Sequence, residues 1–230
     1  MGIFNRGIFN KPSKNKAKIS HLQNKKIFII GFNKTGTTSL KWLFEYWGFN
    51  VGKQQYAELL SIYWYKYGDY ENILKYCDSA QVFQDRPFSS QDFYKKLYNK
   101  YPDALFILTI RDSPDQWFNS LKSYHAKAVG LPSHETPKKE DLNRASYIYP
   151  GFMFDVVCGN YNHPEVPLYD KKTYLNFYTD HINKVEEYFQ DKPDQLIKIN
   201  VSMQEDFKKL CNFLKIKEHN LKSFPHKNKT

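Results

Sequence analysis

The chain has 230 residues and 41% of them are hydrophobic, which is enough for one domain with a substantial core. Its net charge is +10, but residues 1–26 contribute seven basic and no acidic side chains, so the rest of the chain carries only +3. A nucleic-acid-binding domain concentrates its positive charge on a folded face. The charge distribution therefore argues against nucleic acid as a partner.

Cysteine usage and hydropathy exclude several other classes of protein. Cys77, Cys158 and Cys211 are widely spaced, and no CxxC pair indicates a disulfide framework or a zinc site. No apolar run approaches the ~20 residues of a membrane span, and the N-terminus has no signal-peptide pattern. Arg6 stands where an N-myristoylation motif needs serine or threonine. We expect a cytoplasmic protein that binds no metal.

Residues 1–24 are expected to form a basic, disordered tail, and residues 25–230 a single domain. A run of lysines without acidic neighbours is typical of a solvated arm. The alternative is a weak contact of this tail with an anionic membrane or with RNA.

Short apolar segments alternate with amphipathic ones along the domain. The pattern predicts strands at 26–30, 80–84, 104–110 and 196–201. It predicts helices at 37–46, twice within 54–77, at 89–101, from 114 onward, at 171–190 and at 204–214. Residues 129–168 have no steady period and are expected to be irregular. The alternation predicts an α/β protein with a three-layer, P-loop-like fold, in which helices flank a central parallel sheet.

A glycine-bearing loop joins the first predicted strand to the first predicted helix. Gly31 and Gly36 have the spacing of a P-loop, and such a loop points backbone N–H groups at an anion. The lysine, however, precedes the second glycine, whereas a nucleoside-triphosphate enzyme needs it after that glycine. Lys34 is instead placed to reach a bridging oxygen between a phosphate and a transferring group.

The block from Gly31 to Leu40, Gly-Phe-Asn-Lys-Thr-Gly-Thr-Thr-Ser-Leu, resembles the 5′-phosphosulfate-binding loop of sulfotransferases. These enzymes use 3′-phosphoadenosine 5′-phosphosulfate (PAPS) as the donor, and the resemblance is to the bacterial type of the family. It implies nucleotide binding by the loop residues Asn33, Lys34, Thr35, Gly36, Thr37, Thr38 and Ser39.

A second resemblance covers residues 106–120. In the same family, an arginine at the end of a strand and a serine on the next helix hold the donor's 3′-phosphate. The resemblance assigns these roles to Arg111 and Ser120. Ser113 is inserted before Pro114 relative to many members, which leaves Asn119 as an alternative to Ser120. Residues 200–202, 210–214 and 224–226 resemble the family's C-terminal segment less specifically.

The resemblance implies in-line transfer of a sulfuryl group from PAPS to a hydroxyl or amine. Lys34 would stabilise charge on the departing 5′-phosphate. Asp85, at the end of a predicted strand, is placed like the acidic or histidine base of several members, although a turn or helix-capping role is equally compatible. His125 is the second candidate base. The acceptor stays open among a small molecule, a carbohydrate and a lipid, and tyrosines within 56–70 could line its site or simply pack.

Two other functions are compatible with the loop. A P-loop kinase or other nucleoside-triphosphate enzyme would bind ATP with Mg²⁺. A non-catalytic nucleotide-binding protein would bind the donor without turnover. The oligomeric state is left open by the sequence.

Overall fold

The computed structural model describes residues 19–225 except 91, 162–163 and 218–219. The expected tail lies mostly outside the described residues. Its last part does not, because Ser20–Leu22 forms a short 3-10 helix, η1, and Leu22 is buried in the core. The folded chain therefore includes residues before the expected boundary at 25.

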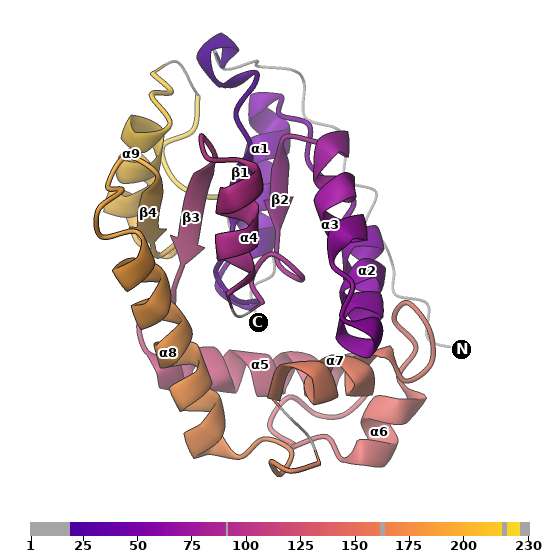
Figure 1. Ribbon diagram of the computed structural model, residues 1–230. Coiled ribbons are helices and arrows are strands. Elements are labelled where there is room, and N and C mark those ends of the chain that lie inside the picture. The colour runs from indigo at the N-terminus through magenta and orange to yellow at the C-terminus, as the bar shows by residue number, and fades with distance from the viewer. Residues whose placement is uncertain (1–18, 91, 162–163, 218–219, 226–230) are drawn as a thin grey trace.

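A four-stranded parallel sheet forms the centre of the protein (Figure 1). The strands lie in the order β2-β1-β3-β4, and their bounds are Ile27–Ile29 for β1, Val82–Gln84 for β2, Leu105–Thr109 for β3 and Leu196–Ile199 for β4. β1, β2 and β3 are buried along their whole length, and they are apolar except for Gln84 and Thr109 at the ends of β2 and β3. The predicted α/β fold with a central parallel sheet is confirmed.

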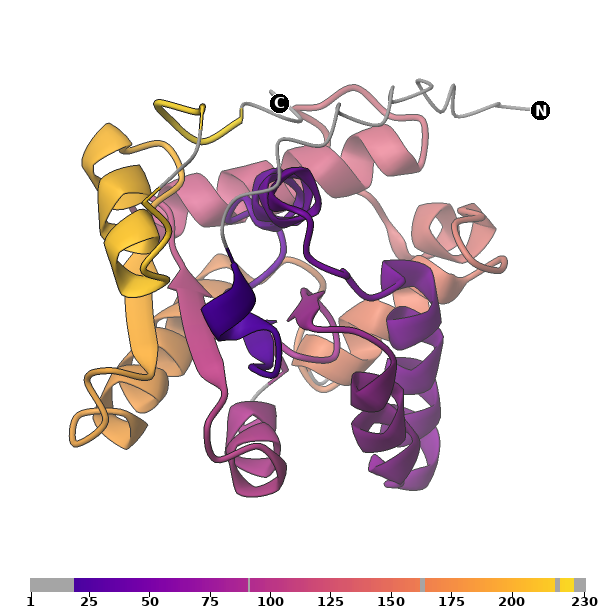
Figure 2. The ribbon, with the colours of Figure 1, turned by 90° about the horizontal axis from the view of Figure 1, so that it is seen from above.

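Helices cover both faces of this sheet (Figures 1 and 2). Successive side chains of a strand point to opposite faces, so Ile27 and Ile29 belong to one core cluster and Phe28 to another. The first cluster contains α1 (Thr37–Trp47) and α9 (Gln204–Phe213). The second contains residues of α2 (Gln54–Tyr67), α3 (Glu71–Tyr76), α4 (Phe93–Lys100) and α8 (Lys171–Tyr188).

A third group of helices crosses the carboxyl edge of the sheet, below the strand arrowheads in Figure 1. It consists of α5 (Pro114–Ala128), α6 (Lys139–Arg144) and α7 (Phe152–Tyr161), which pack with part of α8 in a third cluster. The expectation that 129–168 is irregular is wrong. The helical period of α7 is hidden because its buried residues Phe152, Met153, Val157 and Tyr161, with the partly buried Phe154, are spread over more than half of the helix circumference.

The sheet order places a crevice at this carboxyl edge. The chain passes from β1 to β2 on one side of β1 and then to β3 on its other side. In open parallel sheets such a reversal leaves space beyond the strand ends, where ligands bind. No helix in the described ranges is long and apolar enough to cross a membrane.

Candidate functional site

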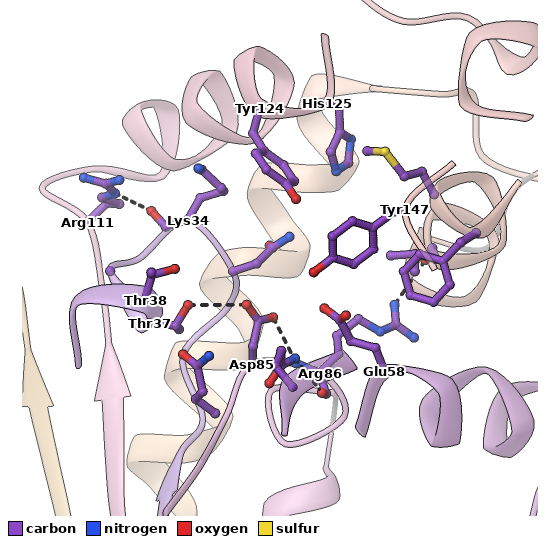
Figure 3. A pocket seen from close by; sticks show the side chains of 17 residues that line it. Lys34, Thr37, Thr38, Glu58, Asp85, Arg86, Arg111, Tyr124, His125 and Tyr147 are labelled. Atoms are coloured by element: carbon purple, nitrogen blue, oxygen red, sulfur yellow. Dashed lines mark hydrogen bonds between the residues drawn. The ribbon is translucent and has the colours of Figure 1, made fainter. Parts of the chain in front are cut away.

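A cavity of about 280 Å³ occupies the carboxyl edge of the sheet (Figure 3). Its walls come from the loop after β1, the ends of β2 and β3, the helices α2, α5 and α7, and the connection before α7. Eight of the predicted site residues line it: Asn33, Lys34, Gly36, Thr37, Thr38, Asp85, Arg111 and His125. The structure thus brings together residues that lie up to 92 positions apart in the chain.

Two glycines allow the loop to press against neighbouring strands. A Cβ atom on Gly31 would lie 2.1 Å from Thr109 Oγ1 and 2.3 Å from the Thr109 carbonyl oxygen. Gly36 has φ +100°, and a Cβ there would lie 2.1 Å from Val201 Cγ2. Any other residue would clash at Gly31, and would be both strained and obstructed at Gly36.

Thr35 and Ser39 do not line the cavity. Thr35 is fully buried; its hydroxyl bonds to the Phe32 carbonyl and lies 2.5 Å from Thr109 Oγ1. Ser39 is also buried, and its N–H donates to the Gly36 carbonyl at 3.0 Å. The Thr35 hydroxyl therefore holds the loop's shape, and the Ser39 backbone joins the first turn of α1 to Gly36.

The loop and the start of α1 present positive charge to the cavity. The first turn of an α-helix leaves N–H groups without intrahelical partners, here those of Thr37 and Thr38. Lys34 has φ +68°, and its ammonium group lies 4.5 Å from the centre of the Tyr124 ring. Burial, and then the nearby Arg111, lower the pKa of Lys34 to about 8, although Asp85 acts in the opposite direction.

Asp85 follows β2 directly and lies next to Thr37 at the start of α1, on the wall of the cavity (Figure 3). Its carboxylate accepts hydrogen bonds from the Arg86 N–H at 2.9 Å and from Thr37 Oγ1 at 3.3 Å. Burial raises its pKa, while these two hydrogen bonds and the charges of Arg86 and Lys34 lower it. The carboxylate is thus positioned beside the anion-binding loop with lone pairs left for a ligand.

His125 reaches the same cavity from α5. Its Nδ1 lies 2.8 Å from the Tyr169 hydroxyl oxygen, and the side chain is buried. Burial, and then the charge of Lys34, lower its pKa to about 4. The imidazole is therefore neutral near pH 7 and accepts a proton weakly.

Only one of the two residues expected to hold a 3′-phosphate lines the cavity. Arg111 lines the cavity, and its Nε donates to the Lys34 carbonyl at 2.5 Å. Ser120 does not line the cavity; its Oγ is buried and has no hydrogen-bond partner in the described part of the chain. The alternative residue, Asn119, is exposed on α5.

The C-terminal segment supports the loop from behind. Asn200 Nδ2 donates to Asp112 Oδ1 at 2.5 Å, which joins the end of β4 to the residue after Arg111. Val201 fills the space beside Gly36. Of the segments with the less specific C-terminal resemblance, residues 200 and 201 thus contact the loop and the residue after Arg111.

Among the cavity residues that sequence reasoning missed are Glu58, Arg86 and Tyr147. Arg86 is buried, and one of its terminal nitrogens donates to the Val156 carbonyl at 3.2 Å and to Asn160. Burial, and then Asp85, raise the pKa of Glu58 to about 8. No local sequence signal marks Glu58, because its place in the cavity depends on how α2 packs against the sheet.

No tyrosine of α2 lines the cavity, although Gln54 and Glu58 of the same helix do. Tyr56, Tyr63, Tyr65 and Tyr67 are exposed, with Tyr67 at 69%. These four therefore neither line the cavity nor lie in the core, whereas Tyr70 packs against the second core cluster, which is the packing role considered from the sequence.

In the described ranges, no group of three or more histidine, cysteine or acidic side chains is arranged to hold a metal ion. The site is built instead from a lysine in the loop, an arginine after β3 and a carboxylate after β2.

This fold and site define an α/β protein with an anion-binding strand–loop–helix unit at the carboxyl edge of a parallel sheet. The family model described as "Sulfotransferase domain" matches residues 26–230, and the chain belongs to this family. The family predicted from the loop is confirmed, and it identifies a transferase that acts with a sulfate donor. No curated protein matches the chain.

Proposed function

We propose that the protein transfers a sulfuryl group from PAPS to a hydroxyl or amine group of an acceptor. The observation that carries the proposal is the position of Lys34 and Asp85 on the wall of one cavity at the carboxyl edge of the sheet. Family membership supports the reaction class, and this geometry supports the roles of the two residues.

The residues around the loop fit an anionic nucleotide donor. The free N–H groups at the start of α1 and the side chains of Lys34 and Arg111 all favour negative charge. Ser120 Oγ is buried without a partner in the described structure, and a phosphate oxygen would satisfy it. Lys34 and the start of α1 would hold the 5′ end, and Arg111 with Ser120 the 3′-phosphate.

The donor supplies an activated sulfuryl group, and its transfer leaves adenosine 3′,5′-bisphosphate. Asp85 accepts the proton of the acceptor as the acceptor's oxygen or nitrogen bonds to sulfur. Lys34 stabilises the negative charge left on the phosphate as the bond between sulfur and the bridging oxygen breaks. His125 is the less suitable base, because its burial favours the neutral imidazole.

Calorimetry tests the donor assignment. We expect adenosine 3′,5′-bisphosphate to bind the full chain with or without Mg²⁺, and more tightly than ATP. Preferential binding of ATP that requires Mg²⁺ would instead support a nucleoside-triphosphate enzyme. Binding of PAPS without turnover over a broad panel of acceptors would support a non-catalytic binding protein.

A further inference from the structure

Glu58 is a cavity residue for which the proposed reaction has no role. It projects from α2, and Figure 3 shows its carboxyl group in the same space as Asp85 and Tyr147. Its Oε2 atom is buried and has no hydrogen-bond partner in the described structure. A buried polar atom without a partner at a cavity wall indicates a ligand group that would complete it.

The two carboxyl groups are not equivalent. Neighbouring carboxylates in a poorly hydrated site disfavour ionisation of both, so one of them keeps a proton. Asp85 accepts hydrogen bonds from the Arg86 N–H and from Thr37, which stabilise its anion. Glu58 Oε2 accepts none, and burial together with Asp85 raises the pKa of Glu58 to about 8 even though hydrogen bonds from Gln54 and Tyr147 act against this. Burial raises the pKa of both groups, and the shared proton is assigned to Glu58 because both oxygens of Asp85 accept a hydrogen bond whereas Glu58 Oε2 accepts none.

The pair consequently offers one hydrogen-bond acceptor and one donor to the bound acceptor molecule. The attacking hydroxyl donates to Asp85 and needs its lone pair for sulfur. A hydrogen bond from Glu58 to that same oxygen would withdraw the electron density that the reaction uses. The proton of Glu58 is therefore suited to a second hydroxyl next to the attacking one.

The charge of the cavity favours this neutral acceptor over an amine. Lys34 and Arg111 are assigned to the donor's phosphates, whereas Arg86, which also lines the cavity, would repel an ammonium group. The rings of Tyr124 and Tyr147 border the same space, where they can contact a ring of the acceptor.

We propose that Glu58 is an acceptor-binding residue that, together with Asp85, selects ring compounds carrying two neighbouring hydroxyl groups. This inference rests on the proposed sulfuryl transfer. One hydroxyl loses its proton to Asp85 and becomes the sulfate ester, whereas the other only accepts a hydrogen bond from Glu58. No covalent bond of Glu58 changes during the reaction.

Binding of matched diols and mono-alcohols tests the inference. The full chain is saturated with adenosine 3′,5′-bisphosphate and titrated with catechol and phenol, and separately with trans-cyclohexane-1,2-diol and cyclohexanol. In at least one pair we expect the diol to bind about tenfold more tightly, as one added hydrogen bond to a buried group predicts. The pair that shows the preference distinguishes an aromatic acceptor from a saturated, sugar-like one.

Variants of Glu58 assign the preference to its side chain. Glu58→Ala should reduce the preference to about threefold or less, since the hydrogen-bond donor is lost. Glu58→Gln should retain it, because the amide still donates, and Glu71→Ala on α3 removes an exposed carboxylate as a matched control. All three variants should bind the bisphosphate like the wild type, which also shows that they fold.

Three results would overturn the inference: equal binding of diol and mono-alcohol, no binding of any probe up to about 10 mM, or a preference that survives in Glu58→Ala. If the bisphosphate itself does not bind the wild type, the proposed function fails and this inference fails with it. If the bisphosphate binds but the diol preference is absent, only the inference fails.

Discussion

Lys34 and Asp85 share a left-handed backbone conformation, with φ values of +68° and +58°. For residues other than glycine this conformation costs roughly 1–2 kcal/mol and persists only where surrounding contacts impose it. Arg111 holds the carbonyl of Lys34, and the Arg86 N–H holds the carboxylate of Asp85. The two residues assigned to the chemistry are therefore held in place before any ligand binds.

The lowered pKa of Lys34 predicts how donor binding depends on pH. The ammonium form binds phosphate, and with a pKa of about 8 it is lost as pH rises through that value. The affinity for adenosine 3′,5′-bisphosphate, measured by calorimetry from pH 6.5 to 9.5, should therefore fall above pH 8. The Lys34→Ala variant should bind the bisphosphate weakly, show no such fall with pH and have no turnover. The Lys41→Ala variant changes a lysine on α1 that pairs with Glu45 at the surface, and it should behave like the wild type. Near-wild-type activity in Lys34→Ala would contradict the assignment.

Substitutions of Asp85 and His125 distinguish which of the two is the general base. Asp85→Asn should lower kcat about 10²–10⁴-fold, the usual contribution of a general base. His125→Ala should have a smaller effect, because a group with a pKa of about 4 accepts a proton weakly at pH 7. Asp103→Asn, which changes an exposed carboxylate after α4, is the control. Unchanged pH–rate profiles in Asp85→Asn would remove Asp85 from the mechanism, and a large loss in His125→Ala alone would give the role to His125.

The strand–loop–helix unit was predictable because its signals are local. A short apolar strand, two spaced glycines and an amphipathic helix follow one another within residues 27–47. Helix α7 was not predictable in the same way. It is buried on more than one side, so its sequence lacks the apolar stripe that reveals a helix at a surface.

A substitution at Gly31 tests the stability of the strand–loop–helix unit. Gly31→Ala would place a Cβ 2.3 Å from the Thr109 carbonyl oxygen and 2.6 Å from its nitrogen, and backbone atoms cannot turn aside as a flexible side chain can. We expect a loss of about 3 kcal/mol in the free energy of unfolding, at the upper end for overpacking. Gly68→Ala, with φ +73° and open space around it, should cost only about 1 kcal/mol. Equal losses for the two variants in urea unfolding would contradict the predicted clash.

At the scale of the whole molecule, the site depends on elements from most of the chain. The loop after β1 supplies Lys34, the end of β2 supplies Asp85, and the end of β3 supplies Arg111. Parallel strands bring their carboxyl ends to one edge, and the helices across that edge close the space into a cavity. Residues 139–161, expected to be irregular, contribute this closure and Tyr147.

The sequence alone determined the fold class and the family, both of which are confirmed. It also predicted Lys34, Asp85 and Arg111 as site residues, because each follows from a strand end or from spacing within one segment. Only the tertiary structure decided that Glu58 stands beside Asp85, that Thr35 faces the interior, and that Ser120 lies off the cavity. These positions depend on how α2 and α5 pack against the sheet. That packing is set by contacts between segments far apart in the chain, which no local pattern encodes.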